Sequence, residues 1–239
     1  IYVAQEGAKD YIVNFAQLTQ RAGNFLVARS EQKGFKWSDL KGKTVLGGRD
    51  GGMPEMVFEY ILRKNGMDPA KDVTIVKNID FGLTAQAFAS GQGDYTVEFE
   101  PFAASLESEK KGVVIASLGE ASGMVPYTAY SAKKSYLKAH EKELLAFTRA
   151  LQKGMDFVLS HTPEEIADVI ADQFPETKRE ALITIITRYH NQGTWKENLI
   201  FEKESFELLQ DILEESGVIK QRASYDTLVD TTLAKKAAK

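Results

Sequence analysis

The sequence predicts an α/β fold, and two observations support that class. Between residues 43 and 117, short runs of β-branched and aromatic residues alternate with stretches whose apolar residues recur at helical spacing. From residue 135 onward, the pattern changes to successive helices. Alternation of strands and helices predicts a parallel sheet with right-handed crossovers, so we expect the first region to form a compact α/β lobe.

The expected elements of this lobe follow one another in a regular order. The strand candidates are short and rich in β-branched and aromatic residues, and they lie at residues 43–47, 73–76, 95–99 and 113–116. The helix candidates between them lie at residues 54–64, 83–89 and 102–110. The predicted order of this lobe is therefore β-α-β-α-β-α-β.

The remainder of the chain predicts five helices and little sheet. Thr162 with Glu165 has capping-box spacing, and Thr177 with Glu180 repeats it. Gly217 suits the end of a helix, because glycine readily adopts a left-handed conformation. The expected helices cover residues 135–160, residues from 163 and from 178 onward, 201–216 and 225–236. The strand candidates outside the first lobe are residues 1–5, 11–18, 25–29 and 127–131.

Composition and charge argue against several classes of function. The chain has 239 residues with 30 Lys+Arg against 34 Asp+Glu, so it lacks the basic excess that a nucleic-acid partner requires. The sequence contains no cysteine, which excludes disulfides, thiolate nucleophiles and cysteine-ligated metal centres. Its three histidines lie far apart, and the sequence indicates no metal and no cofactor. No apolar run approaches the roughly 20 residues that span a bilayer.

A glycine-rich segment between an expected strand and an expected helix is the first candidate site. Its sequence is Gly47-Gly48-Arg49-Asp50-Gly51-Gly52-Met53-Pro54-Glu55. Glycines let a ligand approach the backbone, and the free N–H groups at a helix start attract an anionic or strongly polar group. The segment matches neither the P-loop nor the dinucleotide fingerprint. A tight turn without a ligand is equally compatible with it.

The end of the expected strand at residues 95–99 carries a second candidate. Alternation along a strand places Glu98 and Glu100 on one face and Phe99 on the other. Two carboxylates this close are able to bind an amino-heterocycle or to share a proton. The alternative is structural, because Glu100 precedes Pro101 at an expected helix start and Glu98 is then merely exposed.

A third segment, residues 14–20, combines amides such as Asn14 and Gln17 with alternating apolar residues. Its polar side chains are able to project into a cleft, although a half-buried strand with solvated polar groups is the favoured interpretation. Catalytic signatures are missing from the sequence, which has no G-x-S-x-G motif, no H-E-x-x-H motif and no histidine close to a candidate serine nucleophile.

Five segments, taken in order, resemble one known family. They are DLKGKTV at 39–45, GGxxGGMPE at 47–55, FGLTA at 81–85, ASGQGD at 89–94 and FEP at 99–101. Their order and spacing are similar to those of the NMT1/THI5-like, ThiY/SsuA-type substrate-binding proteins of ABC importers, and the similarity covers nearly the whole chain.

The resemblance implies the periplasmic-binding-protein type II fold, in which two doubly wound lobes are joined by a hinge. Residues 31–126 would form the second lobe, and residues 1–30 with 127–239 the first. The hinge candidates are residues 29–31 and 125–127. Family members begin with a βαβα segment that has no counterpart here, so we expect an incomplete first lobe and a tendency of this piece to associate.

The resemblance also implies a function without chemistry. Such a protein captures a small molecule and delivers it to an ABC permease in the membrane. It works outside the cytoplasm, in the periplasm or lipid-anchored on the outer face of the cytoplasmic membrane, and is a monomer when complete. The residues expected to bind the ligand are Gly51, Gly52 and Met53, then Glu98 and Glu100, and further Phe99, Phe81, Arg49, Asn14 and Gln17.

The residue types at these positions favour one ligand class. Two carboxylates beside Phe99 and Phe81 would repel a small anion and accept hydrogen bonds from ring amines, which favours an aminopyrimidine, a thiamine precursor or another heterocyclic nutrient. The alternative function is an enzyme on the same fold, a pyrimidine-precursor synthase or small dehydratase. Such an enzyme would use Glu98 and Glu100 as acid and base.

Overall fold

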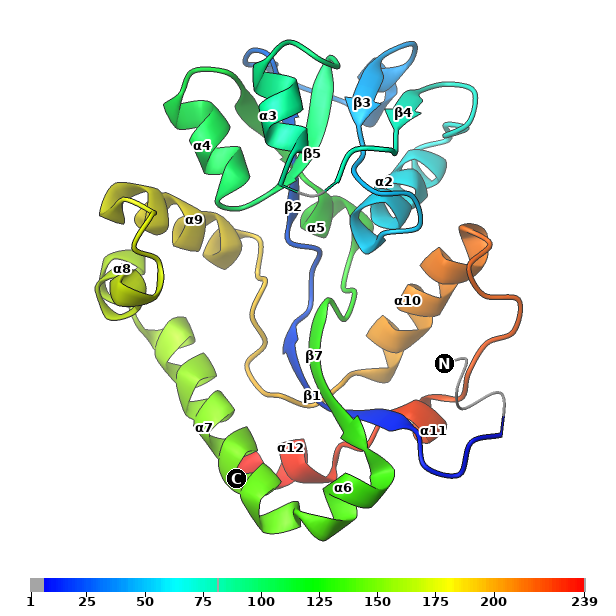
Figure 1. Ribbon diagram of the computed structural model, residues 1–239, viewed down its shortest axis with the longest axis vertical. Helices are drawn as coiled ribbons and strands as arrows, with labels where there is room; N and C mark the ends of the chain where they lie inside the picture. The colour runs from blue at the N-terminus through cyan, green and yellow to red at the C-terminus, as the bar shows by residue number, and fades with distance from the viewer. Residues whose placement is uncertain (1–6, 81, 239) are drawn as a thin grey trace.

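The computed structural model describes residues 7–80 and 82–238, and two sheets lie toward opposite ends of an elongated molecule (Figure 1). The expected strand at residues 1–5 and Phe81 lie outside the described residues. The strands are β1 (Ile12–Thr19), β2 (Asn24–Ala28), β3 (Thr44–Leu46), β4 (Thr74–Val76), β5 (Tyr95–Phe99), β6 (Val113–Ser117) and β7 (Thr128–Lys133). The helices are α2 (Met53–Lys64), α3 (Thr84–Ala89), α4 (Phe102–Ser108), α5 (Leu118–Ser122), α6 (Lys134–Ala139), α7 (Glu141–Ser160), α8 (Pro163–Ile170), α9 (Arg179–Asn191), α10 (Lys203–Glu215), α11 (Tyr225–Leu228) and α12 (Thr232–Ala237), with 3-10 turns η1 (Trp37–Leu40) and η2 (Ala171–Gln173).

The four strands expected between residues 43 and 117 belong to one sheet, whose order is β4-β3-β5-β2-β6. β3 runs parallel to both β4 and β5, as the βαβ alternation predicts. β2 lies antiparallel between β5 and β6, so the sheet is mixed, although the four strands expected in it all run in one direction. The reason is that β2, which precedes residue 31, enters from the other end of the molecule. All of its residues are buried, which suits a central strand.

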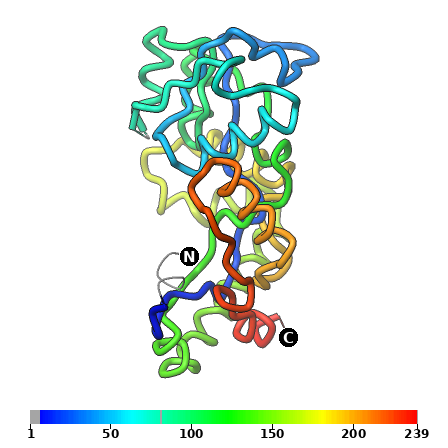
Figure 2. The backbone as a smooth tube through the Cα atoms, turned by 90° about the vertical axis from the view of Figure 1, so that its right-hand side faces the viewer, coloured from blue at the N-terminus to red at the C-terminus, as the bar shows by residue number. Residues whose placement is uncertain are grey.

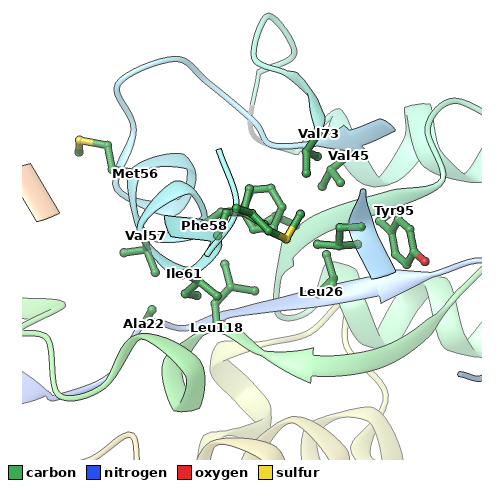
Figure 3. Packing of buried hydrophobic residues seen from close by; sticks show 14 of the residues in the cluster. Ala22, Leu26, Val45, Met56, Val57, Phe58, Ile61, Val73, Tyr95 and Leu118 are labelled. Atoms are coloured by element: carbon green, nitrogen blue, oxygen red, sulfur yellow. The ribbon is translucent and has the colours of Figure 1, made fainter. Parts of the chain in front are cut away.

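The core of this sheet lies against α2 (Figure 3). Val57, Phe58 and Ile61 share the face of α2 that meets the strands, and their side chains are fully buried. They belong to one apolar cluster with Val45 of β3. Ile212 of α10 is part of the same cluster, so the C-terminal region of the chain covers part of this lobe.

The other end of the molecule is built on β1 and β7, which pair antiparallel with two register shifts. Val13 and Phe15 of β1 are buried in a cluster with Leu199 and Leu233. Helices α7 and α12 contact each other beside this sheet. The described part of this region therefore contains few strands and many helices, as the sequence predicts.

Two neighbouring segments, residues 20–23 and 123–127, carry the chain between the sheets (Figure 2). They lie side by side, because the Val125 N–H donates to the Gln20 carbonyl at 2.9 Å. The expected hinge at residues 125–127 falls on the second of them. The expected hinge at residues 29–31 does not lie at a crossing. Arg29 follows the outer end of β2, where its guanidinium donates to the carbonyls of Phe88, Gln92 and Gly93.

The chain is closely packed at residues 20–23, so an added methyl group on the neighbouring Gly119 should destabilise the fold. A Cβ on Gly119 of α5 would lie 2.4 Å from the carbonyl oxygen of Ala22. Because the contact is with backbone, we expect Gly119→Ala to lower the free energy of unfolding by about 1–3 kcal/mol in urea denaturation. Gly154 of α7 is the control, since nothing lies within 4 Å of its Cβ position. Gly154→Ala should be neutral or stabilise by about 0.5–1 kcal/mol, and equal losses in both variants would contradict this account.

The expected C-terminal helices form, with two interruptions. The segment 135–160 divides at His140, which is not helical (φ −120°, ψ 31°). The last helix divides because Val229 forms a bridge to Asn14 of β1, and the Asp230 N–H donates to the Asn14 carbonyl at 2.9 Å. The capping box at Thr162 is confirmed, whereas Lys178 rather than Thr177 precedes α9. Among the described residues, no helix combines the length and apolar character needed to cross a membrane.

Candidate functional site

The glycine-rich turn lies where the parallel strands of the larger sheet end. β3 ends at Leu46 and α2 begins at Met53, so residues 47–52 form the turn between them. Residues 77–83 follow β4, and residues 100–101 follow β5, the parallel neighbours of β3. The carboxyl ends of parallel strands are the usual place for a ligand in an open α/β sheet.

The conformation of this turn explains its glycines. Gly48 and Gly51 have φ values of +88° and +68°, a region that residues with a side chain rarely adopt. Gly47 has no room for a side chain, because a Cβ there would lie 2.5 Å from Cγ2 of Ile75. The turn requires glycine at these positions for its shape alone, and that requirement does not depend on a ligand.

Backbone donors around the end of this turn have no protein acceptor. The Gly52 N–H donates to the Arg49 carbonyl at 3.0 Å, whereas the N–H groups of Gly51 and Met53 form no hydrogen bond with a described residue. Gly51 is exposed, as is the side chain of Arg49, which has no ion pair within the described part of the chain. The structure thus brings Arg49, Gly51, Gly52 and Met53 together, with two free donors at the positive end of a twelve-residue helix.

The side chain of Glu98 is buried and is not exposed at the edge of the sheet. Only 2% of the residue is exposed, and its carboxylate accepts hydrogen bonds from the hydroxyls of Thr84 at 3.1 Å and Thr96 at 2.5 Å. Burial raises the pKa of Glu98 to about 7, against the opposing effect of the two threonine hydroxyls. The alternative in which Glu98 is merely exposed is therefore wrong.

Glu100 has different partners and a different role. Its Oε1 accepts from Nη1 of Arg188 at 2.6 Å, and its Oε2 accepts from the Ala104 N–H at 2.8 Å. The carboxylate thus satisfies a backbone donor in the first turn of α4, as the helix-start interpretation predicts. The pair that alternation predicts does not form, because β5 ends at Phe99 and Glu100 already belongs to the following turn.

Phe99 lies next to the segments that cross between the sheets. Its ring centroid is 6.2 Å from that of Tyr127, whose hydroxyl donates to Oδ1 of Asn24 at 2.7 Å. Burial raises the pKa of Tyr127 far above its ordinary value. Sequence reasoning missed Asn24, Tyr127 and Arg188, because no spacing in the chain connects them with residues 98–100.

Asn14 and Gln17 lie on β1, in the other sheet, and serve its packing. Nδ2 of Asn14 donates to the Leu228 carbonyl at 3.1 Å, and its Oδ1 accepts from the Ser131 hydroxyl at 2.8 Å. Gln17 is fully buried, and its Oε1 accepts from the Glu202 N–H at 3.3 Å. Both amides are thus engaged away from the turn at residues 47–52. Across residues 7–80 and 82–238, no three His, Asp or Glu side chains are placed to hold a metal ion.

Sequence comparison identifies the relatives of this chain. The profile of the family described as NMT1/THI5 like matches residues 2–166. The chain belongs to the NMT1/THI5-like family. One relative, YtlA of Bacillus subtilis (strain 168), is 46% identical over 236 residues, which are 99% of this chain and 71% of YtlA. The name of YtlA describes it, provisionally, as a binding protein.

Solved structures share the fold of this NMT1/THI5-like protein. The zinc-bound ligand-binding component of an ABC-type import system from Staphylococcus aureus has a TM-score of 0.72 and 15% identity, over 98% of this chain and 77% of that one. The alkanesulfonate-binding protein SsuA from Xanthomonas axonopodis pv. citri, bound to MOPS, has 0.70 and 16%, over 96% and 76%. The desulfurization enzyme DszB, as a mutant in complex with biphenyl-2-sulfinic acid, has 0.67 and 10%, over 95% and 78%. These matches confirm the predicted fold class, a mixed α/β periplasmic-binding-protein fold.

Proposed function

We propose that this protein is the solute-binding component of an ABC importer, which captures a small molecule between two lobes and delivers it to a membrane permease. The observation that carries this proposal is the turn at residues 47–52, where Gly51 and Met53 present free donors at the carboxyl edge of parallel strands. Family membership, the name of YtlA and the shared fold support it.

The proposed lobes follow the two sheets. One lobe comprises residues 31–126 together with β2, and the other comprises the remainder of residues 1–30 with 127–239. The lobes close about the crossing segments at residues 20–23 and 123–127. Capture for import places the protein outside the cytoplasm, in the periplasm or lipid-anchored on the outer face of the cytoplasmic membrane, and the complete protein acts as a monomer.

The proposed ligand is a heterocyclic nutrient such as an aminopyrimidine or a thiamine precursor. The free N–H groups of Gly51 and Met53 suit an acceptor atom on such a ligand, and the rings of Phe99 and Tyr127 offer an aromatic surface near the end of β5. Glu98 and Glu100 do not favour this class, because both carboxylates accept hydrogen bonds from protein donors. The turn donors and the aromatic rings carry the proposal instead.

Thermal-shift measurements on the purified protein test both parts of the proposal. The probes are 4-amino-5-hydroxymethyl-2-methylpyrimidine, thiamine and riboflavin, compared with taurine and nitrate. A bound probe at 100 times its Kd stabilises the native state by about 2.7 kcal/mol, which shifts Tm measurably. Stabilisation by taurine or nitrate alone would contradict the ligand class. A protein that responds to no probe and copurifies with no small molecule in native mass spectrometry would contradict the binding function.

A substitution in the turn should weaken ligand binding, while its loss of stability should not exceed that of a matched control substitution. Gly51→Ala puts a side chain at φ +68° beside the free donors, and we expect at least a tenfold rise in Kd for the probe that binds, about 1.4 kcal/mol. Gly34→Ala is the matched control, because Gly34 has φ +74° and open space at its Cβ position, as Gly51 does. Isothermal titration should show normal affinity for Gly34→Ala, and equal losses in both variants would contradict a role of the turn.

An enzyme on the same fold is the second candidate. The observation that favours it is Glu98, whose pKa of about 7 suits proton transfer near neutral pH. Its two threonine donors and its burial argue for a structural role instead. Turnover of a pyrimidine precursor followed by NMR, lost in Glu98→Gln, would favour the enzyme over the binding protein.

A further inference from the structure

The glycine-rich turn depends on the residues that follow β4. The Gly47 N–H donates to the Val76 carbonyl at 2.9 Å, and the Asp50 N–H donates to the Lys77 carbonyl at 3.0 Å. Arg49 also forms a backbone bridge with Asn78. Residues 76–78 therefore support the turn from Gly47 to Asp50, and Lys77 is at the centre of this support.

The side chain of Lys77 reaches the helix that the turn begins. Its Nζ forms ion pairs with Glu55 in the first turn of α2 and with Glu59 in the next turn, and it lies 3.8 Å from Oδ1 of Asp50. The exposed fractions of the Glu55 and Glu59 side chains are only 4% and 12%. Glu59 also accepts from Nη2 of Arg63 at 2.5 Å. Lys77 thus binds the turn by its backbone and the start of α2 by its side chain.

The charges of this cluster matter for the donors above it. Burial and the neighbouring Glu59 raise the pKa of Glu55. Partial burial works against the charge of Lys77, but the two carboxylates outweigh it and raise the pKa of Lys77. Without Lys77, the largely buried Glu55 would have no cation and Glu59 would keep only Arg63. The uncompensated negative charge in the first turns of α2 would then oppose the positive end of this helix.

We propose that Lys77 is a positioning residue of the candidate site, which fixes the turn at residues 47–52 and cancels the negative charge of Glu55 and Glu59 behind its free donors. The fixing of the turn is a property of the chain alone. The effect on a ligand rests on the proposed function.

Hydrogen–deuterium exchange of the full chain tests the positioning role without a ligand. In Lys77→Met, we expect the amides of Asp50 and Met56, which are hydrogen-bonded at the turn, to exchange about tenfold faster than in the wild type. Lys77→Arg should restore slow exchange, because it keeps the cation. Lys71→Met is the matched control, since the Lys71–Asp68 pair is exposed in the same lobe. Unchanged exchange at residues 47–58 in Lys77→Met, or an equal rise over the whole chain, would overturn the proposal.

The charge-cancelling role is tested by a second substitution in the same cluster. Lys77→Met/Glu59→Gln removes one buried carboxylate, so we expect it to recover slow exchange at residues 47–58. It also provides a folded variant if Lys77→Met alone does not fold. No recovery in the double variant would overturn this role.

Binding of the two probes, taurine and 4-amino-5-hydroxymethyl-2-methylpyrimidine, separates this inference from the proposed function. Whichever probe binds the wild type should lose about tenfold in affinity in Lys77→Met and regain it in the double variant. If a probe binds the wild type and Lys77→Met equally well, the inference fails and the proposed function stands. If neither probe binds the wild type, the proposed ligand class fails, and the exchange measurements still decide the role of Lys77.

Discussion

Replacing Arg188 with methionine is expected to lower the free energy of unfolding by about 3–5 kcal/mol. Arg188 lies on α9 and donates from Nη1 to Glu100 at 2.6 Å and from Nη2 to Glu107. Only 2% of the Glu100 side chain is exposed. The substitution would leave a buried carboxylate without its cation, and losing one partner of a buried ion pair costs far more than losing an exposed pair.

Arg222 provides the matched control for this experiment. It also contacts several carboxylates, those of Glu207, Asp211 and Glu214, but its side chain is 39% exposed and the pairs lie at the surface. Arg222→Met should therefore cost far less than Arg188→Met in guanidinium chloride denaturation. Arg188→Met/Glu100→Gln should recover part of the loss, because glutamine still accepts from the Ala104 N–H without a charge. Similar losses in Arg188→Met and Arg222→Met would contradict the argument from burial.

The last turn of α9 contacts the larger sheet. Besides the ion pairs of Arg188, the Tyr189 hydroxyl donates to the Gly23 carbonyl at 3.1 Å, and Nε2 of Gln192 donates to the Ala22 carbonyl at 3.2 Å. These bonds attach the last turn of α9 to the crossing segment at residues 20–23. α9 also packs against α8, because Leu182 and Ile186 share an apolar cluster with Ile166, so this helix connects α8 with the larger sheet.

The strands of the larger sheet could be predicted because their signal is local. β3, β4, β5 and β6 are short β-branched or aromatic runs separated by helical stretches, and each forms where the pattern indicates. The antiparallel place of β2 between β5 and β6 has no such signal. It depends on pairing with Phe99 and Ser117, residues far along the chain, which local propensity does not encode.

The candidate site also contains features that a local sequence signal predicts and features that depend on distant residues. The turn at residues 47–52 could be predicted because a positive φ at Gly48 and Gly51 is a local requirement that glycine satisfies. The roles of Glu98 and Glu100 could not, because they depend on Thr84 and Arg188, whose positions are set by the packing of α3 and α9. The end of β5 at Phe99 also decides that the two carboxylates face different partners.

Glutamine at position 98 is expected to change how stability depends on pH. Burial raises the pKa of Glu98 from 4.5 to about 7, so between these values the native state binds a proton that the unfolded chain releases. The wild type should therefore lose stability as pH rises from 4.5 to 7, by up to about 3 kcal/mol from this group, with little further change above pH 7. Glu98→Gln lacks the titrating group and stays neutral between Thr84 and Thr96.

Urea denaturation of the wild type and Glu98→Gln at intervals from pH 4.5 to 8 isolates this contribution, because the other titrating groups cancel in the difference. The two proteins should be similar near pH 4.5, and the variant should be more stable by about 1–3 kcal/mol at pH 8. Glu31→Gln, which changes an exposed carboxylate in the same lobe, should follow the wild-type curve. Parallel curves for the wild type and Glu98→Gln would show that the pKa of Glu98 is the same in the native and unfolded states. The hydrogen bonds from Thr84 and Thr96 would then fully offset the effect of burial.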